Sequence, residues 1–149
     1  MLPGLRWIFA SIAPPEDYFT RLGVLSISFA EMGAGGALKF RHKYVGKHVA
    51  GLLASKPVPQ GVPSYSANFQ ISLIFLVNGK SVLEKKINTV VGPWWSLSEA
   101  GFTLFDYDVP NGMPIDQDIE CVIRIVVADP DFERLYGPVS VFVRKEFEK

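Results

Sequence analysis

The chain has 149 residues, and its 15 basic residues balance 15 acidic ones, so the formal net charge is zero. This length is enough for one domain with its own core, and the neutral charge argues against a nucleic-acid partner. Hydrophobic residues make up 48% of the chain, which also has 13 glycines and 11 prolines, a composition typical of many short strands joined by turns. No apolar run reaches the roughly 18 residues that a transmembrane helix needs.

Residues 1–23 are predicted to be a leader or a short helical segment, and residues 24–149 a single domain. The apolar run from Trp7 to Ala13 is short for a signal peptide, and Pro14 follows it directly. Pro14, Pro15 and the acids after them are typical of the first turn of a short helix that ends near Gly23. The pattern leaves open whether this part is a native leader, a signal remnant or part of the fold.

The first strands are expected in the segments that alternate apolar and polar residues. They lie at 24–29, 38–44 and 47–54. The segment 38–44 has Lys39, Arg41 and Lys43 on one side and Leu38, Phe40, His42 and Tyr44 on the other, as in a strand with one wet face.

The clearest feature of the sequence is a hairpin over 65–90, in which two β-type segments flank Asn78 and Gly79. Both residues tolerate the positive φ that a type I′ turn requires. The incoming arm is apolar on one face, but Glu84, Lys85 and Lys86 interrupt the outgoing arm. The register therefore stays open between a two-residue loop and a longer or bulged one.

Strands are also expected at 102–107, 119–128 and 138–145, with a short helix between the last two. Asp129 would cap this helix, Pro130 would occupy its first position and Gly137 would end it. Seven or eight short strands and few helices indicate an all-β fold, a two-sheet antiparallel sandwich of immunoglobulin type.

A set of short motifs resembles uncharacterised bacterial β-sandwich domains of cell-envelope or lipoprotein type. The motifs are Phe40-Arg41-His42-Lys43-Tyr44, Asn78-Gly79-Lys80, 94–101, Tyr107-Asp108-Val109-Pro110 and Tyr136-Gly137-Pro138. The resemblance covers about residues 24–149. It implies an architecture and a bacterial envelope location, and it carries no known active site.

Two surfaces are candidates for binding. Trp94 and Trp95 could offer an aromatic platform for a sugar or a protein partner, or else close one end of the sandwich. The basic stripe Lys39, Arg41 and Lys43 could meet an acidic partner, or else be a solvated face.

Metal binding has weaker support. The three pairs Asp106/Asp108, Asp116/Asp118 and Asp129/Asp131 have the carboxylates that Ca²⁺ prefers, but aspartate is also a common turn residue. His42 and His48 would lie about 20 Å apart on an uninterrupted strand, too far to share a metal unless Gly46 folds the chain back. Cys121, the one cysteine, is expected in the core.

The sequence therefore predicts a non-enzymatic domain without a cofactor, which serves as a protein-interaction module. The alternative is a module that binds carbohydrate, or calcium and lipid. No Ser/His/Asp or Cys/His arrangement of a hydrolase is readable.

Overall fold

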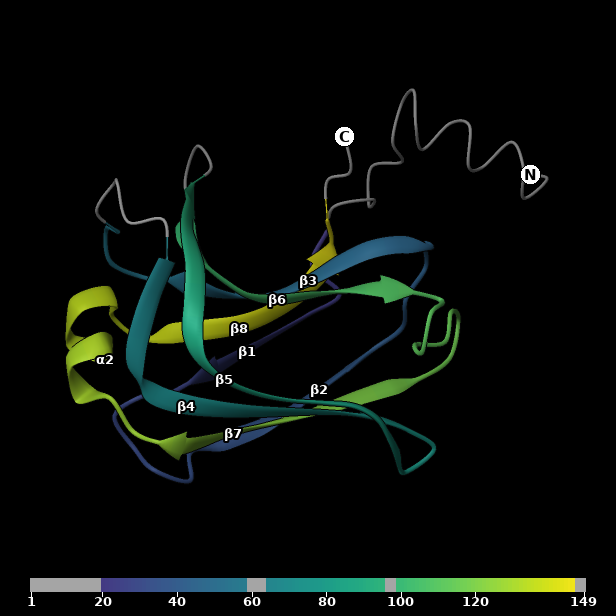
Figure 1. Ribbon diagram of the computed structural model, residues 1–149, viewed down its shortest axis with the longest axis horizontal. Helices are drawn as coiled ribbons and strands as arrows, with labels where there is room; N and C mark the ends of the chain where they lie inside the picture. Colours follow the sequence, from purple (N-terminus) through teal and green to yellow (C-terminus); the bar gives the residue numbers. More distant parts are fainter. Residues whose placement is uncertain (1–19, 59–63, 96–98, 147–149) are drawn as a thin grey trace.

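The computed structural model describes residues 20–58, 64–95 and 99–146, with the side chains of 64–67, 92 and 95 left aside. These residues form an antiparallel sheet and one helix (Figure 1). The elements are β1 (Gly23–Ile27), β2 (Gly35–Phe40), β3 (Gly46–Ala54), β4 (Ser64–Val77), β5 (Lys80–Trp95), β6 (Ala100–Val109), β7 (Ile119–Val127), α2 (Pro130–Tyr136) and β8 (Val139–Lys145). The predicted all-β, antiparallel class is confirmed.

The eight described strands form a single series of ladders in the order β1-β8-β3-β6-β5-β4-β7-β2. The two end strands then meet through side chains, because Leu38 packs against Gly23 and Leu25 packs against Gly36. The sheet therefore curls into a nearly closed barrel around one interior. The structure does not confirm the two-sheet sandwich, since its ladders join all eight strands in one sheet.

The hairpin predicted around Asn78 and Gly79 is confirmed. Asn78 has a φ of 51° and Gly79 a φ of 78°, and Val77 pairs with Lys80 across a two-residue loop. A bulge follows at once, so that Phe75 pairs with Leu83 instead of Val82. The register thus combines the two alternatives that the sequence left open.

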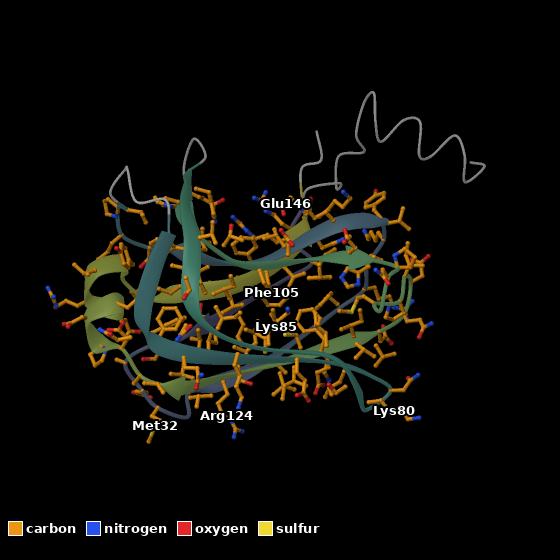
Figure 2. The ribbon with its side chains drawn as sticks, viewed as in Figure 1. Met32, Lys80, Lys85, Phe105, Arg124 and Glu146 are labelled. Carbon is orange, nitrogen blue, oxygen red and sulfur yellow. The ribbon has the colours of Figure 1, made fainter. Side chains whose placement is uncertain are left out.

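The bulge also changes the direction of Lys85. This residue pairs with Leu73, whose side chain is fully buried, so Lys85 projects from the inner face of the sheet. Its Nζ atom lies 5.6 Å from the centre of the Phe105 ring, and Figure 2 shows the two side chains together between β5 and β6. Lys85 covers the barrel interior at this point with its aliphatic stem.

The short helix is also confirmed, with the cap that the sequence predicted. One carboxylate oxygen of Asp129 accepts a hydrogen bond from the Phe132 N–H at 3.1 Å, and the other accepts one from the Asn68 N–H at 3.1 Å. The helix ends at Gly137, which has a φ of 79°. Phe132 packs from α2 against Phe29 and Phe69, and so closes one end of the barrel.

Residues 1–19 of the predicted leader lie outside the described residues, and β1 begins at Gly23, the end of the predicted segment. Residues 96–98, in the connection between β5 and β6, also lie outside them. In the part of the chain that the structure covers, no helix has the length and apolar character to cross a membrane.

The hairpin turn can be tested directly. Gly79→Ala should lower the free energy of unfolding by about 1 kcal/mol, because alanine is strained at positive φ and no neighbouring atom lies within 4 Å of the added methyl group. Asn78→Gly, which keeps the positive φ accessible, is the control and should be close to neutral. Urea unfolding of both variants measures the difference, and equal stabilities would contradict the type I′ turn.

Candidate functional site

A row of mostly apolar residues crosses the outer surface of five neighbouring strands. The register places its members opposite one another on β1, β8, β3, β6 and β5, and they are Val24, Phe142, Gly51, Thr103 and Val91. Directly opposed residues project from the same face of a sheet. Val141 and Val143 on either side of Phe142 belong to the interior cluster, so the row faces outward. Val24 is 49% exposed and Val91 is 53% exposed.

Two glycines let aromatic rings lie directly against the backbone of this row. A Cβ atom on Gly51 would lie 2.8 Å from the Phe142 ring, and one on Gly101 would lie 2.8 Å from the Trp94 indole and 1.8 Å from the carbonyl oxygen of Leu52. The two rings meet edge to face, with their centres 5.7 Å apart. Phe142 is thereby buried on the outside of the barrel, and Trp94 remains half-buried beside it.

Two arginines flank the rings. The guanidinium carbon of Arg21 lies 5.3 Å from the centre of Phe142, and that of Arg144 lies 5.7 Å from Phe142 and 5.8 Å from Trp94. All three distances are within the range of cation–π attraction. Arg21 also donates from Nη2 to Oε1 of Glu99 at 2.6 Å.

The electrostatic surroundings of Arg144 are unusual for an arginine. Burial lowers its pKa, and the nearby Arg21 lowers it further, while Glu146 and Glu99 act in the opposite direction. The guanidinium stays charged at neutral pH, because its reference pKa is so high. The Nε atoms of Arg21 and Arg144 are buried and have no hydrogen-bond partner among the described residues.

An open hollow of about 410 Å³ lies beside the rings, lined by Thr20, Arg21, Val24, Glu99 and Arg144. We call the combined surface the Trp94 face. It consists of the outer row, Trp94, Gly101, Arg21, Arg144 and Glu99. Tryptophan and arginine next to half-covered apolar area are the residue types that dominate binding energy at protein interfaces.

The Trp94 face includes one of the two tryptophans proposed from the sequence. Trp94 contacts Phe142 on the outer surface and does not close a barrel end. The backbone of Trp95 pairs with Ala100, and its side chain lies outside the described residues. Trp94 therefore supplies the described indole of the site, and the proposed platform of two tryptophans lies partly outside the described residues.

Acidic side chains lie beside Lys39 and Arg41, two of the three residues of the basic stripe. Lys39 Nζ lies 3.9 Å from Glu120, and Arg41 Nε lies 2.5 Å from Asp118. Each member of the exposed Arg41–Asp118 pair shifts the pKa of the other, so that the pKa of Arg41 is raised and that of Asp118 is lowered. Lys43 is exposed in the connection after β2. Because its charges are balanced, the stripe is a weaker candidate than the Trp94 face.

The two histidines lie together, unlike histidines on an uninterrupted strand. β2 ends at Phe40 rather than Tyr44, and the chain reverses before β3, where Gly46 has a φ of 113°. The ring centres of His42 and His48 are consequently 4.6 Å apart. His42 Nε2 is 2.8 Å from the Tyr107 hydroxyl, and both histidines are buried at the second end of the barrel.

This cluster is not arranged as a metal site. In the described ranges, no group of three His, Cys, Asp or Glu side chains could hold a metal ion. Burial is the main cause that lowers the pKa of His42 to about 3, and His48 is the second. Cys121 is buried as expected, and burial raises the pKa of its thiol to about 12.

Of the aspartate pairs of the calcium hypothesis, Asp106/Asp108 and Asp129/Asp131 lie at opposite ends of the barrel (Figure 1). The third pair, Asp116/Asp118, lies in the connection between β6 and β7, where Asp118 pairs with Arg41. Asp106 and Asp108 belong to β6, where Asp106 forms an ion pair with Lys47 at 3.5 Å. Asp129 uses both carboxylate oxygens to cap α2 and to hold Asn68, and Asp131 lies 3.5 Å from Arg134. The structure therefore gives these aspartates roles in turns and ion pairs, and it does not bring the first two pairs together.

Comparison with known proteins gives no match to a family model, a curated protein or a solved structure. The resemblance to bacterial envelope domains therefore stays a prediction, and the function rests on the site alone.

Sequence reasoning missed Phe142, Arg144, Arg21 and Glu99. A signal for two of them was present in the last strand, where Val139, Val141 and Val143 alternate inward and leave Phe142 and Arg144 on the wet face. An aromatic residue on a wet face, followed by an arginine on the same face, indicates a surface cluster. Arg21 and Glu99 carry no comparable signal, because they reach the face through the fold.

The buried His42 predicts a pH-dependent stability. Its pKa is about 3 in the folded protein and about 6.5 when unfolded, so the unfolded chain binds a proton that the folded protein excludes. Lowering the pH from 7 to 5 should therefore reduce the free energy of unfolding by about 2 kcal/mol through this residue.

His42→Gln should flatten this dependence, and Asp118→Asn, which alters an exposed carboxylate, is the control that should keep it. Urea unfolding at pH 7, 6 and 5 measures the three slopes. Equal slopes in the wild type and His42→Gln would show that His42 is protonated normally in the folded protein.

Proposed function

We propose that this protein is a non-enzymatic interaction module that binds a protein partner through the Trp94 face. The observation that carries the proposal is the outward placement of Trp94 and Phe142 on two glycine positions, between Arg21 and Arg144. Aromatic rings that stand on the wet side of a barrel are not needed for its interior core, which the inward residues already fill.

The composition of the face supports a protein partner. Exposed Val24 and Val91 extend the apolar area on either side of the rings, and the arginines form a polar rim. This arrangement of an aromatic centre and a polar margin is the usual anatomy of protein interfaces. Sugar binding usually relies on a flat, open aromatic surface, whereas Trp94 stands edge to face against Phe142.

A bacterial envelope location belongs to the same proposal, and its support is the sequence resemblance alone. The described residues of the Trp94 face include no arrangement of side chains typical of an active site. The histidine cluster is buried and contacts Tyr107, and the Cys121 thiol has a raised pKa, which is unfavourable for a nucleophile.

The proposal predicts that a random peptide library displayed on phage contains binders that require this face. Val91→Asp and Val24→Asp place a charge on exposed positions of the face and should abolish binding of the selected peptides. Val126→Asp, on the outer surface of β7, is the matched control because Val126 is also exposed, at 36%. It should leave binding unchanged.

Fluorescence anisotropy of labelled peptides on the four proteins gives the comparison, and Trp94→Ala provides a further test at the centre of the face. If no selected peptide depends on Val91 or Val24, the proposed function is wrong. Binding on a glycan array that Trp94→Ala removes, without any such peptide, would favour a sugar ligand instead.

A further inference from the structure

The two arginines of the Trp94 face identify the chemistry of its partner. Resting on the function proposed above, we infer that the partner inserts an aspartate or glutamate carboxylate between Arg21 and Arg144, where it takes the place of Glu99. The ligand is thus an acidic peptide segment with apolar neighbours, rather than a purely apolar one.

The first support is the number of hydrogen-bond donors that remain at the site. A guanidinium has five N–H donors in a rigid fork, and stacking on an aromatic ring leaves its edge free to donate. Among the described residues, neither buried Nε atom of Arg21 or Arg144 has a partner. Both arginines line the same hollow, so an oxygen acceptor placed there would lie beside the outer N–H groups of both guanidinium groups.

The second support is the proximity of two positive charges. Arg21 disfavours the charged form of Arg144, and Glu99 favours it. An anion between two like charges relieves their repulsion, and carboxylates pair with guanidinium groups through strong, charge-assisted hydrogen bonds. The site is therefore complementary to a negative group.

The third support is that a carboxylate already fits. Glu99 Oε1 lies 2.6 Å from Arg21 Nη2, and the two side chains are 35% and 30% exposed. An incoming carboxylate would exchange this ion pair for another of the same kind. Glu99 then acts as an internal competitor that pairs with Arg21 until a partner binds.

Exposed Val24 on the rim of the hollow and the half-buried Trp94 ring beside Arg144 define the rest of the ligand. Residues next to the carboxylate would lie on apolar surface, where burial of aliphatic or aromatic side chains is favourable. The expected motif is an acidic residue flanked by large apolar ones.

The test uses the peptides selected on the wild-type protein. Each acidic residue of a selected peptide is replaced by its amide, Asp by Asn or Glu by Gln, and the dissociation constants of both forms are measured by fluorescence anisotropy. One of these replacements should weaken binding to the wild type about tenfold, because a charge-assisted hydrogen bond is lost.

Variants of the protein should respond in opposite directions. Arg144→Gln should weaken the acidic peptide about tenfold and abolish the difference between the acidic and amide forms. Glu99→Gln should strengthen binding of the acidic peptide about threefold, because it removes the competitor. Arg124→Gln is the charge-matched control, since Arg124 is exposed on β7, whose neighbours β4 and β2 carry no residue of the outer row.

The gain in Glu99→Gln keeps the test valid if Arg144→Gln folds poorly, since loss of structure does not increase affinity. Selected peptides that need Val91 but bind equally well in acid and amide forms would overturn the inference and leave the proposed function intact. Tighter binding after replacement of the acid by phosphoserine would identify a phosphorylated partner and also overturn it. A library without any Val91-dependent peptide contradicts the proposed function itself.

Discussion

The hydrogen-bond register of β3 between β8 and β6 is the constraint on which the candidate site depends. β3 pairs Gly51 with Phe142 on one side and with Thr103 on the other, and this places an aromatic ring and a vacant Cβ position on the same outer surface. A slip of one residue would exchange the two faces of each strand. Phe142 would then point into the interior in place of Val141 and Val143. The close packing of the Trp94 indole on Gly101 would also be lost.

The same alternation gives the barrel two different chemistries. Inside, aliphatic and aromatic side chains fill the middle and the α2 end, and the opposite end holds His42, His48 and Tyr107. Burial raises the pKa of Tyr107 and lowers that of His42, so the interior keeps both groups neutral. Outside, Arg21 and Arg144 remain charged and reachable. Lys145 is an exception, because it is buried on β8 opposite His48. Charge at the outer surface suits binding, and neutral groups at most inward positions suit stability.

The sequence predicts those parts of the fold that depend on local patterns. The alternation of β7, the Asn78-Gly79 turn and the Asp129 cap all follow from residues that are neighbours in the chain. The closure of the sheet does not, because it depends on Leu25 against Gly36 and Leu38 against Gly23, contacts between side chains that no periodicity reveals. The histidine pair was missed for a similar reason, since β2 ends two residues before His42. Trp94 is a candidate that the sequence offers, but Arg21 and Glu99 are far apart in the sequence and become neighbours only in the barrel.

The most direct test of the central claim, that the Trp94 face is the binding surface, is site-specific photo-crosslinking in cells of the native organism. A photoreactive amino acid replaces Val91 in one protein and Val126 in another, two exposed valines on different parts of the barrel. The account predicts a discrete crosslinked partner from position 91 that Arg144→Gln weakens, and none from position 126. A partner captured from position 126 alone, or one captured equally from both positions and insensitive to Arg144→Gln, would contradict it.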